Sequence, residues 1–186
     1  MKTKKVIFLF FLLVAVGGIV VFVSLNKKGE KQLVNQESVR ERDIAVIRNL
    51  SGNQDTKIEF IEAGKSSNGL NVPVNIYYAS ADQYEIDTMG KIVEFRSRDL
   101  PVGSENEKAV DNTPRYSQQD LENMARQFVA KNTDVNFDSL TPNHGVKGTN
   151  HFFKWEDRTR KTSEGYPFVQ VGFSQGGTLL NYVNTL

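Results

Sequence analysis

Hydrophobic residues follow three patterns along this chain. From Val6 to Leu25 the sequence is apolar almost without a break, Ser24 being the exception. Further along, short segments alternate apolar and polar residues, as strands do when one face is buried. Other segments repeat apolar residues three and four positions apart, which predicts amphipathic helices. The sequence therefore predicts an α+β protein with an N-terminal transmembrane helix.

The apolar segment from Val6 to Leu25 is long enough to cross a bilayer. A helix rises about 1.5 Å per residue, so roughly 20 residues span the hydrocarbon layer. A cleaved signal peptide is the alternative, but its apolar stretch is typically about 7 to 15 residues, and cleavage after Ala15-Val16-Gly17 would leave an apolar mature end. A buried core helix would need an equally apolar partner, which the sequence lacks. We expect residues 1–28 to form an uncleaved membrane anchor.

The orientation of this anchor is predicted from the size of its two flanks. The numbers of lysines on the two sides of the apolar segment are nearly equal, so the positive-inside rule alone barely distinguishes the two orientations. Residues 1–5 form a short stub, whereas the other side carries a whole folded region, and long domains translocate largely regardless of charge. We expect a single-pass membrane protein with a cytoplasmic N-terminus and with residues 26–186 extracytoplasmic.

After a polar linker at residues 29–36, the pattern predicts a first α+β unit at residues 37–98. A helix over 37–52 should close at Gly52, a residue type that often terminates helices. A strand should follow at 57–63. Residues 74–97 should then form consecutive strands with a tight turn at 88–91.

Residues 99–115 are rich in Pro, Gly, Asn and charge and predict a connector to a second unit at 116–186. Ser117 and Asp120 form a capping signal for a helix whose apolar residues fall at i, i+3, i+4, i+7 and i+8, namely Leu121, Met124, Ala125, Phe128 and Val129. A strand at 151–158 and a closing hairpin at 165–186 complete the unit. We expect the last strand to form an edge of its sheet.

The two units contain related hairpins. Residues 84–97 match residues 171–184 without a gap at an offset of 87, and Gly90 falls on Gly177. Glycine supplies the positive φ that tight hairpin turns need. The alternation places apolar side chains on one face and predicts that the intervening polar ones, Glu85, Asp87, Ser174 and Asn181, point away from it. Together with the preceding helix and strand, this match predicts an internal repeat.

The first hairpin contains the pattern Tyr-x-Ile-Asp-x-x-Gly-x-Ile, carried by Tyr84, Ile86, Asp87, Gly90 and Ile92. This helix, strand and hairpin arrangement resembles the PepSY domain family over residues 37–97 and 117–185. The second copy departs from the pattern, with Ser174 at the aspartate position and an added Gly176.

The PepSY resemblance implies small modules with a helix on an antiparallel sheet. They occur in propeptides of thermolysin-type metalloproteases and, often in tandem, in membrane-anchored envelope proteins of bacteria. It further implies a non-enzymatic module that binds or restrains an extracytoplasmic partner, often a peptidase or cell-wall hydrolase. The family transfers no catalytic residues to this chain.

Charge and composition narrow the possible functions. Residues 29–186 carry 18 basic and 22 acidic side chains, so they lack the basic surface of a nucleic-acid binder. The sequence contains no cysteine, which excludes disulfides, thiolate nucleophiles and thiolate metal ligands.

Residues that could carry chemistry are few and scattered. His144 falls in a predicted loop and His151 at a strand start, without metal-ligand or catalytic-triad spacing. Glu85 and Asp87 could form an acid-base pair, but such a pair usually marks a solvated sheet face. Trp155 could stack on a ligand, but core packing under the second helix is the favoured interpretation.

The sequence therefore predicts a non-enzymatic, membrane-anchored, extracytoplasmic binding or regulatory module with a protein partner and no cofactor, metal or nucleic acid. Two alternatives stay open. One is an envelope hydrolase that uses Glu85 and Asp87 or His144. The other is a structural envelope subunit that assembles with itself.

Overall fold

The computed structural model describes residues 36–98 and 109–186, which contain two helices and one eight-stranded antiparallel sheet. The first helix covers residues 36–51. The other elements are β1 (Ile58–Lys65), β2 (Pro73–Ala79), β3 (Asp82–Asp87), β4 (Ile92–Ser97), α2 (Gln118–Asn132), η1 (Phe137–Ser139), β5 (Thr141–Lys147), β6 (Asn150–Glu156), β7 (Phe168–Ser174) and β8 (Leu179–Asn184). The predicted α+β class is confirmed.

The chain divides into two compact units, Met1–Arg42 and Asp43–Leu186. The described part of the first unit is helical residues 36–42. The predicted anchor at residues 1–28 and most of the linker lie outside the described residues. Within 36–98 and 109–186, none of the helices has the length and apolar character needed to cross a membrane.

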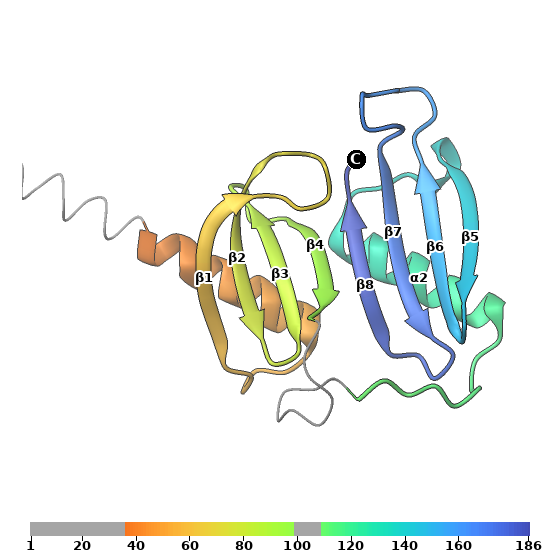
Figure 1. Ribbon diagram of the computed structural model, residues 1–186, viewed down its shortest axis with the longest axis horizontal. Helices are drawn as coiled ribbons and strands as arrows, with labels where there is room; N and C mark the ends of the chain where they lie inside the picture. Colours follow the sequence, from red (N-terminus) through yellow and green to blue (C-terminus); the bar gives the residue numbers. More distant parts are fainter. Residues whose placement is uncertain (1–35, 99–108) are drawn as a thin grey trace, which may run out of the picture. The chain divides into compact units, whose positions relative to one another are not determined.

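The sheet of the second unit is built from two meanders. Its strand order is β1-β2-β3-β4-β8-β7-β6-β5, so each half runs from an outer strand towards the centre (Figure 1). The halves join where β4 pairs with β8. The expectation that the last strand is an edge is therefore wrong, because β8 lies between β4 and β7.

The predicted relation between the two hairpins is confirmed by their backbone geometry. The β3–β4 ladder shifts register between Glu85 and Ile86, and the β7–β8 ladder shifts between Gly172 and Phe173, again 87 residues apart. Gly90 and Gly177 occupy the turns with φ of 85° and 86°. Both turns are therefore closed in the same way.

Ser174 takes over part of the role that Asp87 has in the first turn. The Asp87 carboxylate accepts a hydrogen bond from Lys91 N at 2.8 Å, and Ser174 Oγ accepts one from Thr178 N at 3.1 Å. Ser174 is buried. Its hydroxyl donates to Asp111 O, from the segment before α2, and accepts from Thr178 N in the turn, so both segments lie against it.

The junction of the two halves has the register of a two-fold axis. Phe95 pairs with Tyr182, its equivalent in the repeat, and the flanking pairs Glu94 with Val183 and Arg96 with Asn181 exchange when the halves are exchanged. Two equivalent strands that pair antiparallel in this way form a self-complementary contact, as in symmetric dimers. The sheet is thus built from two related halves that meet at β4 and β8.

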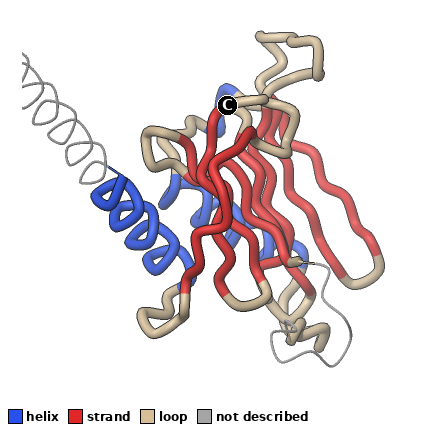
Figure 2. The backbone as a smooth tube through the Cα atoms, turned by 60° about the vertical axis from the view of Figure 1, so that its left-hand side comes forward, coloured by secondary structure: helices blue, strands red, loops and turns tan. Residues whose placement is uncertain are grey.

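The hydrophobic core lies on one face of this sheet, where α2 packs against β6 and β7 (Figure 2). Leu121, Ala125 and Val129 of α2 are buried there, as the predicted periodicity requires. The first helix contributes Ile47 and the buried Asp43, whose carboxylate accepts hydrogen bonds from Asn75 Nδ2 (2.8 Å) and Tyr77 OH (2.9 Å).

The predicted helix ends are confirmed. Ser117 accepts from Asp120 N, and the Asp120 side chain accepts from Ser117 N, which forms a capping box at the start of α2. At the other helix, Gly52 has φ of 68° and its N–H donates to Arg48 O at 3.0 Å. This left-handed residue ends the helix because glycine adopts it without steric cost.

Candidate functional site

The face of the sheet opposite α2, here called the open face, carries polar residues in its centre. In the described ranges no helix covers this face (Figure 2). Because strand side chains alternate, Glu85 and Glu94 lie on the open face when Tyr84 and Phe95 face the core. Glu85 and Glu94 are register partners on β3 and β4, so two carboxyl groups stand side by side.

Both carboxyl groups are buried because the β1–β2 loop, residues 66–72, lies over them. Glu85 is 1% exposed and Glu94 is 8% exposed. Ser67 N donates to Glu85 Oε2 at 2.8 Å, and Ser67 Oγ lies 2.7 Å from Glu85 Oε1 and 3.0 Å from Glu94 Oε2. Burial raises the pKa of Glu94 and outweighs the hydrogen bond with Ser67, which lowers it, while Glu85 raises it further and Arg96 lowers it.

The prediction that Glu85 and Asp87 form a pair on a solvated face of the sheet is wrong. Glu85 is buried under the loop, which corrects the sequence-based expectation, because residues 18 positions away in the chain fold back over it. Asp87 instead closes the β3–β4 turn, where its Oδ1 accepts from Met89 N (2.9 Å) and Lys91 N (2.8 Å). Both carboxylates therefore have structural hydrogen-bond partners.

The structure brings the two histidines together. His144 lies in strand β5, which corrects the predicted loop, and His151 lies in β6 as expected. His144 Nε2 and His151 Nδ1 are 3.2 Å apart, and the His144 ring stacks on Phe153. Partial burial lowers the pKa of His151, and His144 lowers it further. Within the described residues, no group of three or more potential metal ligands surrounds this pair.

Trp155 belongs to the core, as the sequence predicted. It is 1% exposed, and its ring packs edge-on against Phe137 at 4.9 Å between centroids. The guanidinium of Arg126 lies 5.2 Å above the indole ring. The indole therefore anchors η1 and α2 to the sheet.

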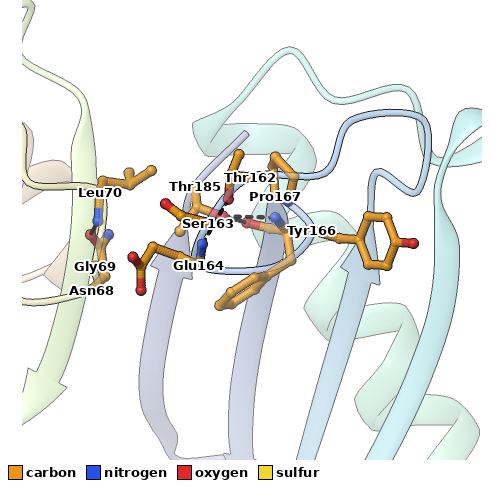
Figure 3. Close-up of a pocket in the computed structure, with 10 residues that line it drawn as sticks. Asn68, Gly69, Leu70, Thr162, Ser163, Glu164, Tyr166, Pro167 and Thr185 are labelled. Carbon is orange, nitrogen blue, oxygen red and sulfur yellow. Dashed lines mark hydrogen bonds between the residues drawn. The ribbon is translucent and has the colours of Figure 1, made fainter.

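A cleft of about 230 Å³ lies between the β1–β2 loop and the β6–β7 loop (Figure 3). It is lined by Asn68, Gly69, Leu70, Thr162, Ser163, Glu164, Tyr166, Pro167, Phe168 and Thr185. Leu70 and Tyr166 are both partly exposed. The lining combines an aliphatic residue and two aromatic residues with residues that carry hydroxyl, amide and carboxylate groups.

Local hydrogen bonds hold both walls of the cleft. Asn68 Nδ2 donates to Val93 O at 3.3 Å and ties the β1–β2 loop to β4. On the other wall, Thr162 Oγ1 donates to Gly165 O at 2.8 Å within the β6–β7 loop. The loops approach closely at Gly69, where an added Cβ would lie 3.8 Å from Glu164 Cγ.

Sequence reasoning missed Glu94, Ser67 and the cleft. A signal for Glu94 was present, because the hairpin register around Gly90 places Glu94 opposite Glu85. No local pattern indicated that Ser67 would cover both, or that residues near 69 and 164 would meet. Such contacts depend on how the loops return over the sheet.

The fold places this chain in a class of α+β proteins with helices on one face of an antiparallel sheet, and two loops of that sheet form a cleft. No family model and no curated protein matches this chain. Among solved structures, the chain is similar to the Bacillus megaterium YpeB C-terminal domain, with 14% identity and a TM-score of 0.54. The match covers 77% of this chain and 61% of that chain, which is less than two thirds of its length.

The YpeB C-terminal domain carries PepSY-like domains, so the predicted PepSY-like fold is supported. At this identity the likeness concerns the fold.

Proposed function

We propose that this chain is a non-enzymatic binding module, anchored in the membrane through Val6 to Leu25, that holds an extracytoplasmic protein partner in the cleft between the β1–β2 and β6–β7 loops. The resemblance of its hairpin motif to the PepSY family suggests a peptidase or a cell-wall hydrolase as that partner. The module would restrain or present the enzyme at the membrane surface.

The cleft is the observation that carries this proposal. It lies between two loops, and both halves of the repeat contribute a wall. Partly exposed Leu70 and Tyr166 offer apolar contact area, and tyrosine is enriched among the residues that contribute most to binding energy. Hydroxyl and amide groups around them supply hydrogen bonds to a partner backbone.

The hydrolase alternative lacks such support. A general acid and base must reach the substrate, but Glu85 is 1% exposed and Asp87 bonds the turn backbone. His144 contacts His151 and Phe153 without a carboxylate within hydrogen-bond distance among the described contacts. These groups have the surroundings of structural residues.

Site-specific cross-linking in intact membranes tests the proposal. The variant Leu70→benzoyl-phenylalanine places a photoreactive group in the cleft, and we expect a discrete adduct with another protein. Adding Tyr166→Ala at unchanged membrane abundance should remove most of this adduct. The variant Val146→benzoyl-phenylalanine, on exposed strand β5, serves as the matched control and should give none.

An adduct of the chain with itself would support the self-assembling subunit instead. Absence of an adduct at Leu70, or an equally strong one at Val146, would contradict the cleft as the binding site. The proposed topology is tested separately, because protease added outside cells without an outer membrane should digest residues 29–186. Protection of those residues would show that the orientation is inverted.

A further inference from the structure

The carboxyl pair Glu85 and Glu94 is not a requirement of the fold. The repeat places Gly172 and Asn181 at the equivalent positions of the second half, which has the same bulged hairpin. There the Phe152 ring lies so close to the sheet that an added Cβ on Gly172 would be 2.8 Å from it. One half thus covers these positions with an aromatic ring, and the other buries two acids.

The hydrogen bonds at Ser67 imply a shared proton. Its hydroxyl lies within hydrogen-bond distance of Glu85 Oε1 (2.7 Å) and Glu94 Oε2 (3.0 Å), yet a hydroxyl has one proton to donate. If both acids were ionised, one contact would join two oxygens without a proton. Like charges directly opposite on neighbouring strands are also destabilising. A protonated carboxyl group that donates to Ser67 Oγ gives each of the two contacts its own proton.

The surrounding donors indicate which acid carries this proton. Glu85 accepts from Ser67 N at 2.8 Å and from Gln83 Nε2 at 3.1 Å, besides the Ser67 hydroxyl. Those contacts suit a carboxylate. Glu94 Oε2 has the Ser67 hydroxyl as its contact, so Glu94 O–H can donate to Ser67 Oγ while Ser67 O–H donates to Glu85.

The groups facing Glu94 agree with this assignment. From β3 it faces Glu85, and from its own strand Arg96 Nε approaches Glu94 Oε1 to 3.7 Å, beyond a short ion pair. Strand β8 presents Val183, which does not titrate, and the covering loop presents the Ser67 hydroxyl. The half-exposed Arg96 is screened by solvent and favours ionisation only weakly.

We propose that Glu94, Ser67 and Glu85 form a proton-dependent latch that holds the β1–β2 loop over the sheet as one wall of the cleft. When Glu94 releases its proton to solvent, the donor to Ser67 is lost and two buried negative charges face each other. The loop then opens. The effect on partner binding rests on the proposed function, whereas the latch is a property of the chain alone.

The direction of the pH effect follows from the raised pKa of Glu94. The closed loop is fully favoured below the ordinary glutamate value of 4.5 and loses this advantage as pH rises through the raised value. Between the two values, the open-to-closed ratio should rise by up to about tenfold per pH unit. Above the raised value it should level off.

Hydrogen exchange of the full-length protein in detergent micelles tests the latch between about pH 4 and 8. After correction for intrinsic exchange, we expect the protection of amides 67–72 in the wild type to fall by up to about tenfold per pH unit. Glu94→Gln should stay protected throughout, because its amide N–H replaces the carboxyl O–H as donor. Ser67→Ala should lose protection at every pH. Glu62→Gln, an exposed acid on β1, is the matched control and should follow the wild type.

The latch is refuted if Glu94→Gln follows the wild-type pH curve, or if Ser67→Ala remains protected. Cross-linking through Leu70→benzoyl-phenylalanine at about pH 5 and 8 then tests the link to binding. The adduct should weaken at the higher pH in the wild type and persist with Glu94→Gln. Lack of any adduct with a normal exchange result would reject the proposed function and leave the latch standing. A strong adduct together with either of the refuting exchange results would reject the latch and leave the proposed function standing.

Discussion

At the scale of single residues, Phe152 lies between two glycines that differ in the space they leave for a side chain. On the open face, register pairs connect Gly145 with Phe152 and Phe152 with Gly172. A Cβ on Gly172 would lie 2.3 Å from Asn181 Oδ1 and 2.8 Å from the Phe152 ring, whereas one on Gly145 meets nothing within 4 Å. The close approach of the ring to the backbone therefore requires glycine at position 172.

We expect Gly172→Ala to lower the free energy of unfolding by about 1–3 kcal/mol, because the added methyl group overpacks a filled site. Gly145→Ala is the matched control and should change it by no more than about 0.5 kcal/mol. Denaturant titrations of both variants measure the difference. Equal stability of the two variants would contradict the contact with Phe152.

The His144 and His151 pair predicts a loss of stability in acid. Because the folded state lowers the pKa of His151, its stabilising contribution is present above the unfolded value of about 6.5 and disappears as pH falls through the lowered value. Protonation of both rings also removes the N–H···N hydrogen bond between them.

We expect His151→Gln to reduce the drop in unfolding midpoint between about pH 7 and 5, measured in urea at both values. His144→Gln should have a smaller effect in the same direction, since it removes the charge of His144 but leaves His151 partly buried. The pairing would be contradicted if both variants kept the full wild-type pH dependence.

At the scale of elements, β8 is the strand on which both halves depend. It pairs with β7 through the closing hairpin and with β4 across the junction, and its Tyr182 is fully buried against Phe128 of α2. A strand in this central place contributes two ladders of hydrogen bonds and a large aromatic side chain to the core.

Deleting residues 179–186 should therefore abolish folding. Loss of a buried aromatic side chain alone costs about 3–5 kcal/mol, and the broken hydrogen-bond ladders add to this cost. The free energy of unfolding of a typical domain is only about 5–15 kcal/mol. Circular dichroism and limited proteolysis measure the outcome. Removing Leu186 alone is the control and should leave the fold intact, because that residue is exposed beyond β8. A folded deletion variant would contradict the central role of β8.

At the scale of the whole molecule, the pseudo-two-fold junction joins the halves of the second unit into one sheet. Phe95 and Tyr182 meet at its centre, and both belong to the same hydrophobic core as Ile47 and Trp155. A continuous sheet and core predict that the halves unfold together.

The chain's single tryptophan, Trp155, reports on the second half. We expect Ile86→Ala, a buried change in the first half, to lower the Trp155 fluorescence midpoint as much as the circular dichroism midpoint. The loss should be about 2–5 kcal/mol. Val146→Ala on exposed β5 is the control. An unchanged fluorescence transition in Ile86→Ala would show that the halves unfold independently.

The sequence by itself determined the local elements of this protein. Apolar spacing and the Ser117 cap set α2, Gly52 ends the first helix, and alternation around Gly90 and Gly177 sets two equivalent hairpins. These features follow from the sequence because each depends on residues only a few positions apart, whose backbone preferences act within one turn or one hairpin.

Only the tertiary structure decided the pairing of β4 with β8, the meeting of His144 and His151, and the burial of Glu85 and Glu94 under Ser67. The cleft depends on the return of two loops separated by about 90 residues. A period-two pattern states which side chains share a face but not what covers that face. Glu85 was expected to be solvated because the pattern of the strand's own residues contains no information about the loop that covers it.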